Sequence, residues 1–151
     1  MNQTTKEILF LDPVCTHNIW GGTRLRTEFG YPVEGDDIGE CWGISAHPNG
    51  DGSIRNGVYA GMKLSKVWEE HPEVFGNLAY DRFPLLTKII DAKADLSIQV
   101  HPDDAYAKEH ENGSFGKTEC WYIMDAPENA TLVIGHNAKT VSYTHLRAHE
   151  T

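Results

Sequence analysis

The sequence predicts a mainly β protein, an antiparallel sandwich or barrel with a few short helices. Three observations support this prediction. Short runs of apolar and β-branched residues recur along the chain, each bounded by turn-forming residues. Helical periodicity is confined to short stretches. The chain shows neither an internal repeat nor a strand–helix–strand alternation, which argues against a parallel sheet.

The first half of the chain is expected to supply three strands. Residues 8–14 predict the first strand, ended by Pro13, and the Gly21–Gly22 pair that follows interrupts the backbone. The stretch 38–53 predicts a strand and then a loop rich in Pro, Asn, Asp and Gly. A short strand comes next, with a turn at Asn56–Gly57.

A short helix and a buried strand are expected next. In MKLSKVWEEHPEVFGN, Leu64, Val67 and Trp68 fall at helical spacing, and the proline that follows limits the helix to a few turns. The nearly continuous apolar run 83–92 predicts a strand buried on both faces. Lys88 lies inside this run, so its ammonium group either reaches the surface or faces a polar cavity.

The remaining segments predict a helix between further strands. Residues 96–101 (LSIQVH) predict a strand. The stretch PDDAYAKEHENG predicts a helix with Pro102 at its first position and Gly113 at its end. Residues 118–126 predict another strand, PENA a turn, and 131–135 a last strand.

The bulk composition narrows the classes of function. The chain has 151 residues, enough for one domain or for part of a larger one, and a formal charge of −9. This charge argues against a nucleic-acid partner, because phosphate backbones require a basic face. The odd number of cysteines (Cys15, Cys41, Cys120) predicts reduced thiols and a cytoplasmic location. We expect neither a signal peptide nor a membrane span, since no long apolar run occurs.

A set of polar residues near the end of the chain predicts a metal site. Because strand side chains alternate, Ser97, Gln99 and His101 share one face of their expected strand, which would line a cavity inside a barrel. Glu119 opens the next expected strand, and Lys117 points to the same face. An imidazole, a carboxylate and an amide oxygen are a suitable ligand set for Zn²⁺.

Simpler interpretations of the same residues stay open on spacing alone. His101 can be a hydrogen-bonded histidine and Glu119 a solvated carboxylate. Lys88 can lie at a rim, and Glu40 can be a hydrogen-bonded strand residue rather than an acid catalyst. The tryptophans Trp42 and Trp121 suit the core better than a ligand platform.

Five segments together resemble a known family. They are NIWGG, IGECWGIS, FPLLTKIIDA, LSIQVHPDD and GKTECWYI, in this order. The chain resembles the start of a type I mannose-6-phosphate isomerase, in its short bacterial form, over residues 7–140. The resemblance implies a cupin-type (jelly-roll) β-barrel. It also implies a metal-dependent aldose–ketose isomerase that interconverts mannose 6-phosphate and fructose 6-phosphate through an enediol(ate).

The resemblance also assigns site residues. It implies one Zn²⁺ per subunit, with His101 and Glu119 as ligands and Gln99 as a further ligand. It places Ser97, Lys88 and Lys117 around a small sugar-phosphate substrate, with Lys117 in a catalytic role. No nucleic-acid or membrane partner is implied.

One departure from the family affects what this chain is expected to do alone. The family's remaining histidine ligand and a catalytic arginine lie beyond the segment of resemblance. We therefore expect residues 1–140 to be the N-terminal catalytic domain of such an enzyme, with an incomplete barrel and no activity alone, and 141–151 to be a non-native-looking tail. Two other classes stay open: another cupin metalloenzyme, such as an Fe(II) dioxygenase, and a non-catalytic module that binds sugar phosphate or metal.

Overall fold

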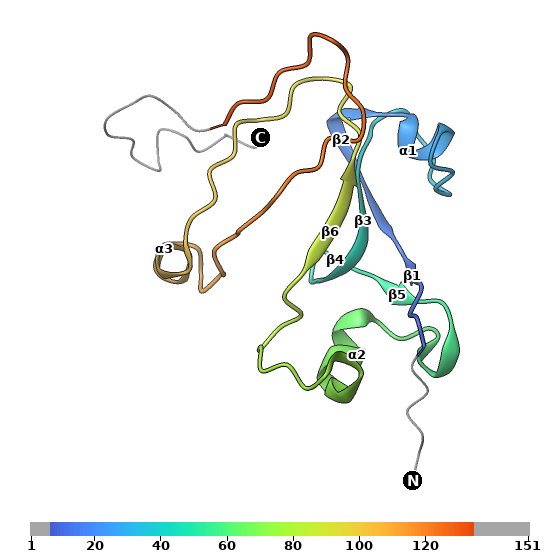
Figure 1. The fold of residues 1–151 in the computed structure, drawn as a ribbon, viewed down its shortest axis with the longest axis vertical. Coiled ribbons are helices and arrows are strands. Elements are labelled where there is room, and N and C mark those ends of the chain that lie inside the picture. Colours follow the sequence, from blue (N-terminus) through green and yellow to red (C-terminus); the bar gives the residue numbers. More distant parts are fainter. Residues whose placement is uncertain (1–6, 135–151) are drawn as a thin grey trace. The chain divides into compact units, whose positions relative to one another are not determined.

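The computed structural model describes residues 7–134, which fall into two compact units. The first unit ends at Leu96 and contains the strands of the described chain. The second begins at Ser97, and its residues up to 134 contain one helix. Figure 1 shows the order of these elements along the chain. The described residues include no helix long and apolar enough to cross a membrane.

A four-stranded antiparallel sheet forms the first unit, with β3 (Ile38–His47) at its centre. Strand β2 (Val14–Gly22) pairs with one edge of β3 and β6 (Leu86–Ile90) with the other, and the three run side by side in Figure 1. Strand β4 (Gly50–Asp51) folds back on the end of β3. The antiparallel, mainly β architecture predicted from the sequence is therefore confirmed.

Shorter elements surround this sheet. Strands β1 (Leu11–Asp12) and β5 (Ser53–Ile54) form a separate two-stranded sheet. The helices of the first unit are α1 (Arg24–Thr27), the 3₁₀ turn η1 (Gly57–Tyr59), α2 (Leu64–Glu70) and the 3₁₀ turn η2 (Pro72–Phe75). Helix α2 begins and ends where its apolar spacing and the following proline predicted.

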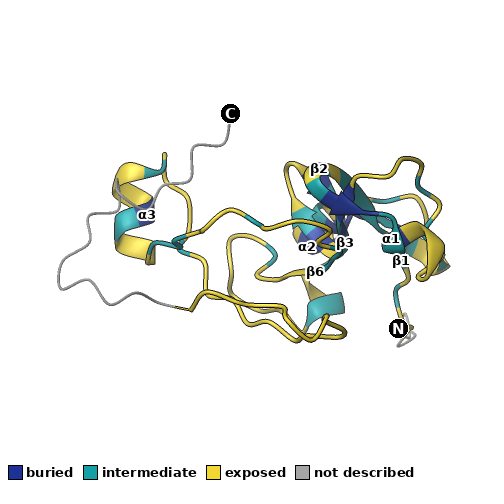
Figure 2. Ribbon diagram, turned by 90° about the horizontal axis from the view of Figure 1, so that it is seen from above, coloured by how far each residue is buried: buried dark blue, intermediate teal, exposed yellow. Residues whose placement is uncertain are grey.

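The core of the first unit lies between α1 and the sheet. Leu25 of α1 is fully buried against Ile38 and Cys41 of β3. Cys15 faces Cys41 across β2 and β3, with 3.0 Å between the two Sγ atoms, and both are free thiols. Burial, together with the Cys15 hydrogen bond, raises the pKa of the Cys41 thiol to about 12. Figure 2 shows buried residues gathered on β2, β3 and α2.

One prediction for the first unit was confirmed and another was wrong. Pro13 ends the first strand as predicted, because β1 stops at Asp12 and β2 begins at Val14 with a new partner, Trp42 of β3. The run 83–92 is not buried on both faces: β6 pairs with β3 alone among the described strands, and Leu85 before it is 63% exposed. An apolar run at a sheet edge therefore looked like a central strand in the sequence.

In the second unit the helix was predicted correctly and the strands were not. Helix α3 (Asp104–His110) follows Asp103, whose side chain accepts a hydrogen bond from the Tyr106 backbone N–H, so it begins two residues later than predicted. The turn at PENA is present. Residues 96–101, 118–126 and 131–134 contain no strand, since no backbone ladder joins them to another described segment. The expected tail, 141–151, lies outside the described residues.

Candidate metal centre

The loop after α3 returns to the start of that helix. The Gly116 backbone N–H donates to the Asp104 carboxylate at 2.8 Å, and the Lys117 N–H donates to the Pro102 carbonyl at 3.2 Å. These two bonds hold Lys117 beside the segment that carries His101. A side chain at Gly116 would place its Cβ 2.6 Å from the backbone of Asp103 and Asp104, so the close approach requires glycine.

Three side chains converge where this loop closes. The His101 Nε2 lies 3.1 Å from one carboxylate oxygen of Glu119, and the Lys117 Nζ lies 2.7 Å from the other. The Lys117 Nζ is also 3.3 Å from His101 Nε2. The Trp121 indole N–H donates to Glu119 at 2.9 Å. The carboxylate thus receives partners on both oxygens.

These neighbours keep Glu119 ionised. Partial burial alone would raise the pKa of its carboxyl group. The hydrogen bonds from Lys117 and Trp121 and the charges of Lys117 and His101 outweigh that effect and lower the pKa to about 2. At neutral pH Glu119 is therefore the carboxylate form that a metal ion requires.

The geometry of the pair suits a single divalent ion. Donor atoms 3.1 Å apart can both lie about 2.0–2.2 Å from one zinc ion. The residues 7–134 contain no group of three or more His, Cys, Asp or Glu side chains that could hold a metal. Within the described chain, His101 and Glu119 therefore fit as part of a zinc ligand set rather than as a complete one.

Within the second unit, two other predicted site residues are not drawn into this cluster. Ser97 and Gln99 are exposed, and neither makes a hydrogen bond to the three side chains in the described part of the chain. Lys88 belongs to the first unit, where its ammonium group donates to Glu40 at 2.6 Å. Glu40 is thus a hydrogen-bonded strand residue, which was one of the open interpretations.

Sequence reasoning missed the role of the two tryptophans. The tripeptide Glu-Cys-Trp occurs at 40–42 and again at 119–121. In both places the indole N–H donates to the glutamate two residues earlier, and a lysine ammonium binds the second carboxylate oxygen. In an extended segment, residues two apart lie on the same face. The repeated Glu-Cys-Trp tripeptide was therefore the sequence signal for this contact between glutamate and tryptophan.

Comparison with known proteins places the chain in one protein family. The family description "Phosphomannose isomerase type I, catalytic domain" matches residues 8–134. The chain is 56% identical over 136 residues to the putative mannose-6-phosphate isomerase YvyI of Bacillus subtilis, covering 90% of the chain and 43% of that protein. It is 55% identical over 136 residues to ManA of the same organism, with 90% and 43% covered.

A solved structure agrees with this result. The crystal structure of the mannose 6-phosphate isomerase from Bacillus subtilis superposes with a TM-score of 0.79 at 59% identity, over 81% of this chain and 39% of that one. This likeness confirms the expected cupin-type fold. The chain spans less than half the length of the relatives it matches.

Proposed function

This chain belongs to the phosphomannose isomerase type I family, and on this premise we propose that its protein interconverts mannose 6-phosphate and fructose 6-phosphate with a bound zinc ion. The observation that carries the proposal is the convergence of His101 and Glu119, 3.1 Å apart, beside Lys117. Relatives named as mannose-6-phosphate isomerases favour this activity over that of an Fe(II) dioxygenase or a non-catalytic binding module.

We assign the ligand role to His101 and Glu119, with Gln99 as a further ligand. Aldose–ketose isomerisation moves a proton between C2 and C1 through an enediol(ate) that carries developing negative charge. A zinc ion, when bound, stabilises that charge by polarising the sugar oxygens. Trp121 keeps the Glu119 carboxylate oriented, since its indole N–H occupies the oxygen that also faces His101.

The lysines serve the substrate in this proposal. Lys117 assists ring opening or stabilises a sugar oxygen, and Lys88 and Ser97 donate to the sugar or its phosphate. An ammonium group has three N–H donors. Lys88 uses one on Glu40, and Lys117 has both Glu119 and His101 as neighbours, so each keeps at least one donor for a ligand. The free cysteines fit the reducing cytoplasm in which we place the protein.

A chimera tests this function. Residues 8–134 are placed in ManA of Bacillus subtilis in place of the matching segment, and conversion of mannose 6-phosphate is measured. We expect activity, and we expect His101→Ala and Glu119→Gln to lower it by more than about a hundredfold, because losing a ligand costs more than losing an outer-shell partner. His110→Ala, a histidine of α3 outside the cluster, is the matched control and should retain activity. An active His101→Ala chimera would refute the assignment.

The same reasoning predicts what the chain does by itself. A catalytic zinc site has three protein ligands and one open position. The described residues bring together only two, so the 151-residue chain alone is expected to show negligible turnover.

A further inference from the structure

Two cysteines form a thiol pair inside the first unit, and the proposed isomerase chemistry does not use them. Cys15 of β2 and Cys41 of β3 are register partners, directly opposite each other in the antiparallel ladder. Residues opposite each other in such a ladder have Cα atoms about 4.5–5.5 Å apart, within the range of about 4.4–6.8 Å that a disulfide spans. The backbone therefore already holds the two residues at the separation that a disulfide bond requires.

The side chains of the pair lie on the same face of the sheet. Cys41 belongs to the core cluster with Leu25 and Ile38, and Cys15 packs against that cluster. The two Sγ atoms are in contact at 3.0 Å, and both are free thiols. A bond between them can therefore form without a change of strand register or of the face that each side chain occupies.

The two thiols differ in what they can do first. Cys41 is fully buried, whereas Cys15 is only partly buried, so the solvent reaches Cys15. Burial and the Cys15 hydrogen bond, which raise the pKa of Cys41 to about 12, keep it protonated at neutral pH. Because the thiolate is the form that attacks an oxidant, Cys15 is the attacking group and Cys41 the partner that follows.

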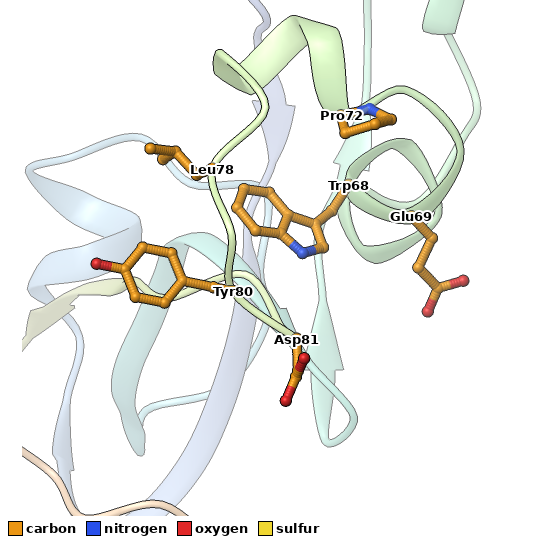
Figure 3. Close-up of a pocket in the computed structure, with 6 residues that line it drawn as sticks. All are labelled: Trp68, Glu69, Pro72, Leu78, Tyr80 and Asp81. Carbon is orange, nitrogen blue, oxygen red and sulfur yellow. The ribbon is translucent and has the colours of Figure 1, made fainter.

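The pocket beside α2 is a separate feature of the same unit. It has a volume of about 240 Å³, and Figure 3 shows the side chains that line it. Neither cysteine is among them. An oxidant therefore approaches Cys15 from the solvent and does not need this pocket.

We propose that Cys15 and Cys41 form a reversible disulfide when the chain meets hydrogen peroxide. The Cys15 thiolate attacks one peroxide oxygen, the O–O bond breaks, and the products are a sulfenic acid on Cys15 and hydroxide. The hydroxide takes up the proton that Cys15 had released. The Cys41 sulfur then displaces the hydroxyl group from the sulfenic sulfur, and the Cys41 proton leaves with that group as water. The thiols are thus oxidised to one disulfide, and the peroxide is reduced to water.

The bond would tie β2 to the central strand of the sheet. The ladder between β2 and β3 is regular from Val14 to Thr16 and shifts in register after Thr16, so the disulfide would close the last regular part before this irregularity. Disulfides in cytosolic proteins are usually transient and respond to oxidants. A reversible bond is therefore compatible with the reducing cytoplasm in which we place the protein.

Peptide mapping of the Cys120→Ser chain tests the proposal, because this substitution removes the exposed third thiol. The chain is treated with hydrogen peroxide under native conditions, remaining thiols are alkylated, and the protein is digested with trypsin without reduction. Trypsin cuts after Arg24 and Arg26, so Cys15 and Cys41 fall on different peptides. We expect mass spectrometry to find these peptides joined, and both thiols to return after dithiothreitol. Cysteines that stay free, or that are oxidised separately without a bond between them, overturn the proposal.

Two further variants in the Cys120→Ser background test the order of the steps. With Cys41→Ala, the sulfenic acid on Cys15 has no thiol to meet, so its trapping by dimedone should rise severalfold. With Cys15→Ala, the buried Cys41 alone should react with peroxide severalfold more slowly than Cys15 does. Equal dimedone labelling of Cys15 with and without Cys41 would refute the pair, and equal reactivity of the two single thiols would refute the assigned order. The peptide map needs neither variant, so it decides the disulfide even if one of them fails to fold.

Discussion

At the scale of single residues, the Glu119 carboxylate is shared between an imidazole, an ammonium group and an indole N–H. The ammonium of Lys117 sits close to both His101 and Glu119, at 3.3 and 2.7 Å. It therefore supplies the positive charge that a metal ion would otherwise bring to these two ligands. Lys117 has two opposing effects in our proposal: it competes with the metal, and it assists the substrate.

The substitution Lys117→Met separates these two effects. Removing the ammonium frees Glu119 and should strengthen zinc binding by the chain roughly two- to fivefold, because an exposed ion pair is worth about 0.2–1 kcal/mol. In the ManA chimera the same substitution should lower turnover, since the assisting group is lost. Zinc affinity and turnover are measured on the same variant. A fall in both quantities would contradict the competition between Lys117 and the metal.

The sequence predicted some contacts of these residues and missed others. For His101, Lys117 and Glu119, alternation suggested a shared face and the resemblance to the isomerase family assigned them to one site. The three side chains do converge, although the segments that carry them are not strands. The Trp121 contact was missed, because its indole direction depends on a side-chain rotamer that spacing does not fix. The Lys88–Glu40 pair was also missed, because it depends on how β6 registers against β3.

At the scale of elements, α3 and its returning loop build the candidate site. Asp103 caps the helix, Asp104 binds the Gly116 N–H, and the Pro102 carbonyl binds the Lys117 N–H. The site is therefore organised by local hydrogen bonds rather than by a pair of strands. This helix was predictable from Pro, Asp and Gly at its ends, which act locally. The strands 96–101 and 118–126 were predicted wrongly, because a strand needs a partner that sequence periodicity does not supply.

The substitution Gly116→Ala tests this loop. The added Cβ would lie 2.6 Å from the backbone of Asp103 and Asp104, so the loop must move and carry Lys117 and Glu119 away from His101. We expect weaker zinc binding, measured by calorimetric titration. We also expect the structure of the first unit to stay unchanged, which is monitored through the spectroscopic signals of its core residues. Gly43→Ala is the control, because its Cβ would meet only the Thr87 carbonyl, at 3.9 Å. Normal zinc affinity in Gly116→Ala would show that the loop does not position the site.

At the scale of the whole molecule, the mainly β fold and the family were predictable from the sequence. Strand-forming runs and turn residues indicated the mainly β fold, and five ordered segments indicated the family. The comparisons agree with both. The burial of the run 83–92 was not predictable, because edge and central strands share the same apolar composition. With a net charge of −9, binding of a sugar phosphate would depend on local cations, which is the role that we propose for Lys88 and Lys117.

The central claim is that His101 and Glu119 hold a metal ion, and zinc binding by the 151-residue chain tests it most directly. Equilibrium dialysis against Zn²⁺, followed by metal analysis, is carried out on the parent chain, His101→Ala, Glu119→Gln and the control His110→Ala. We predict measurable binding by the parent and by His110→Ala, and an affinity at least about tenfold lower in the other two. Equal zinc binding by the parent chain, His101→Ala and Glu119→Gln would contradict the account.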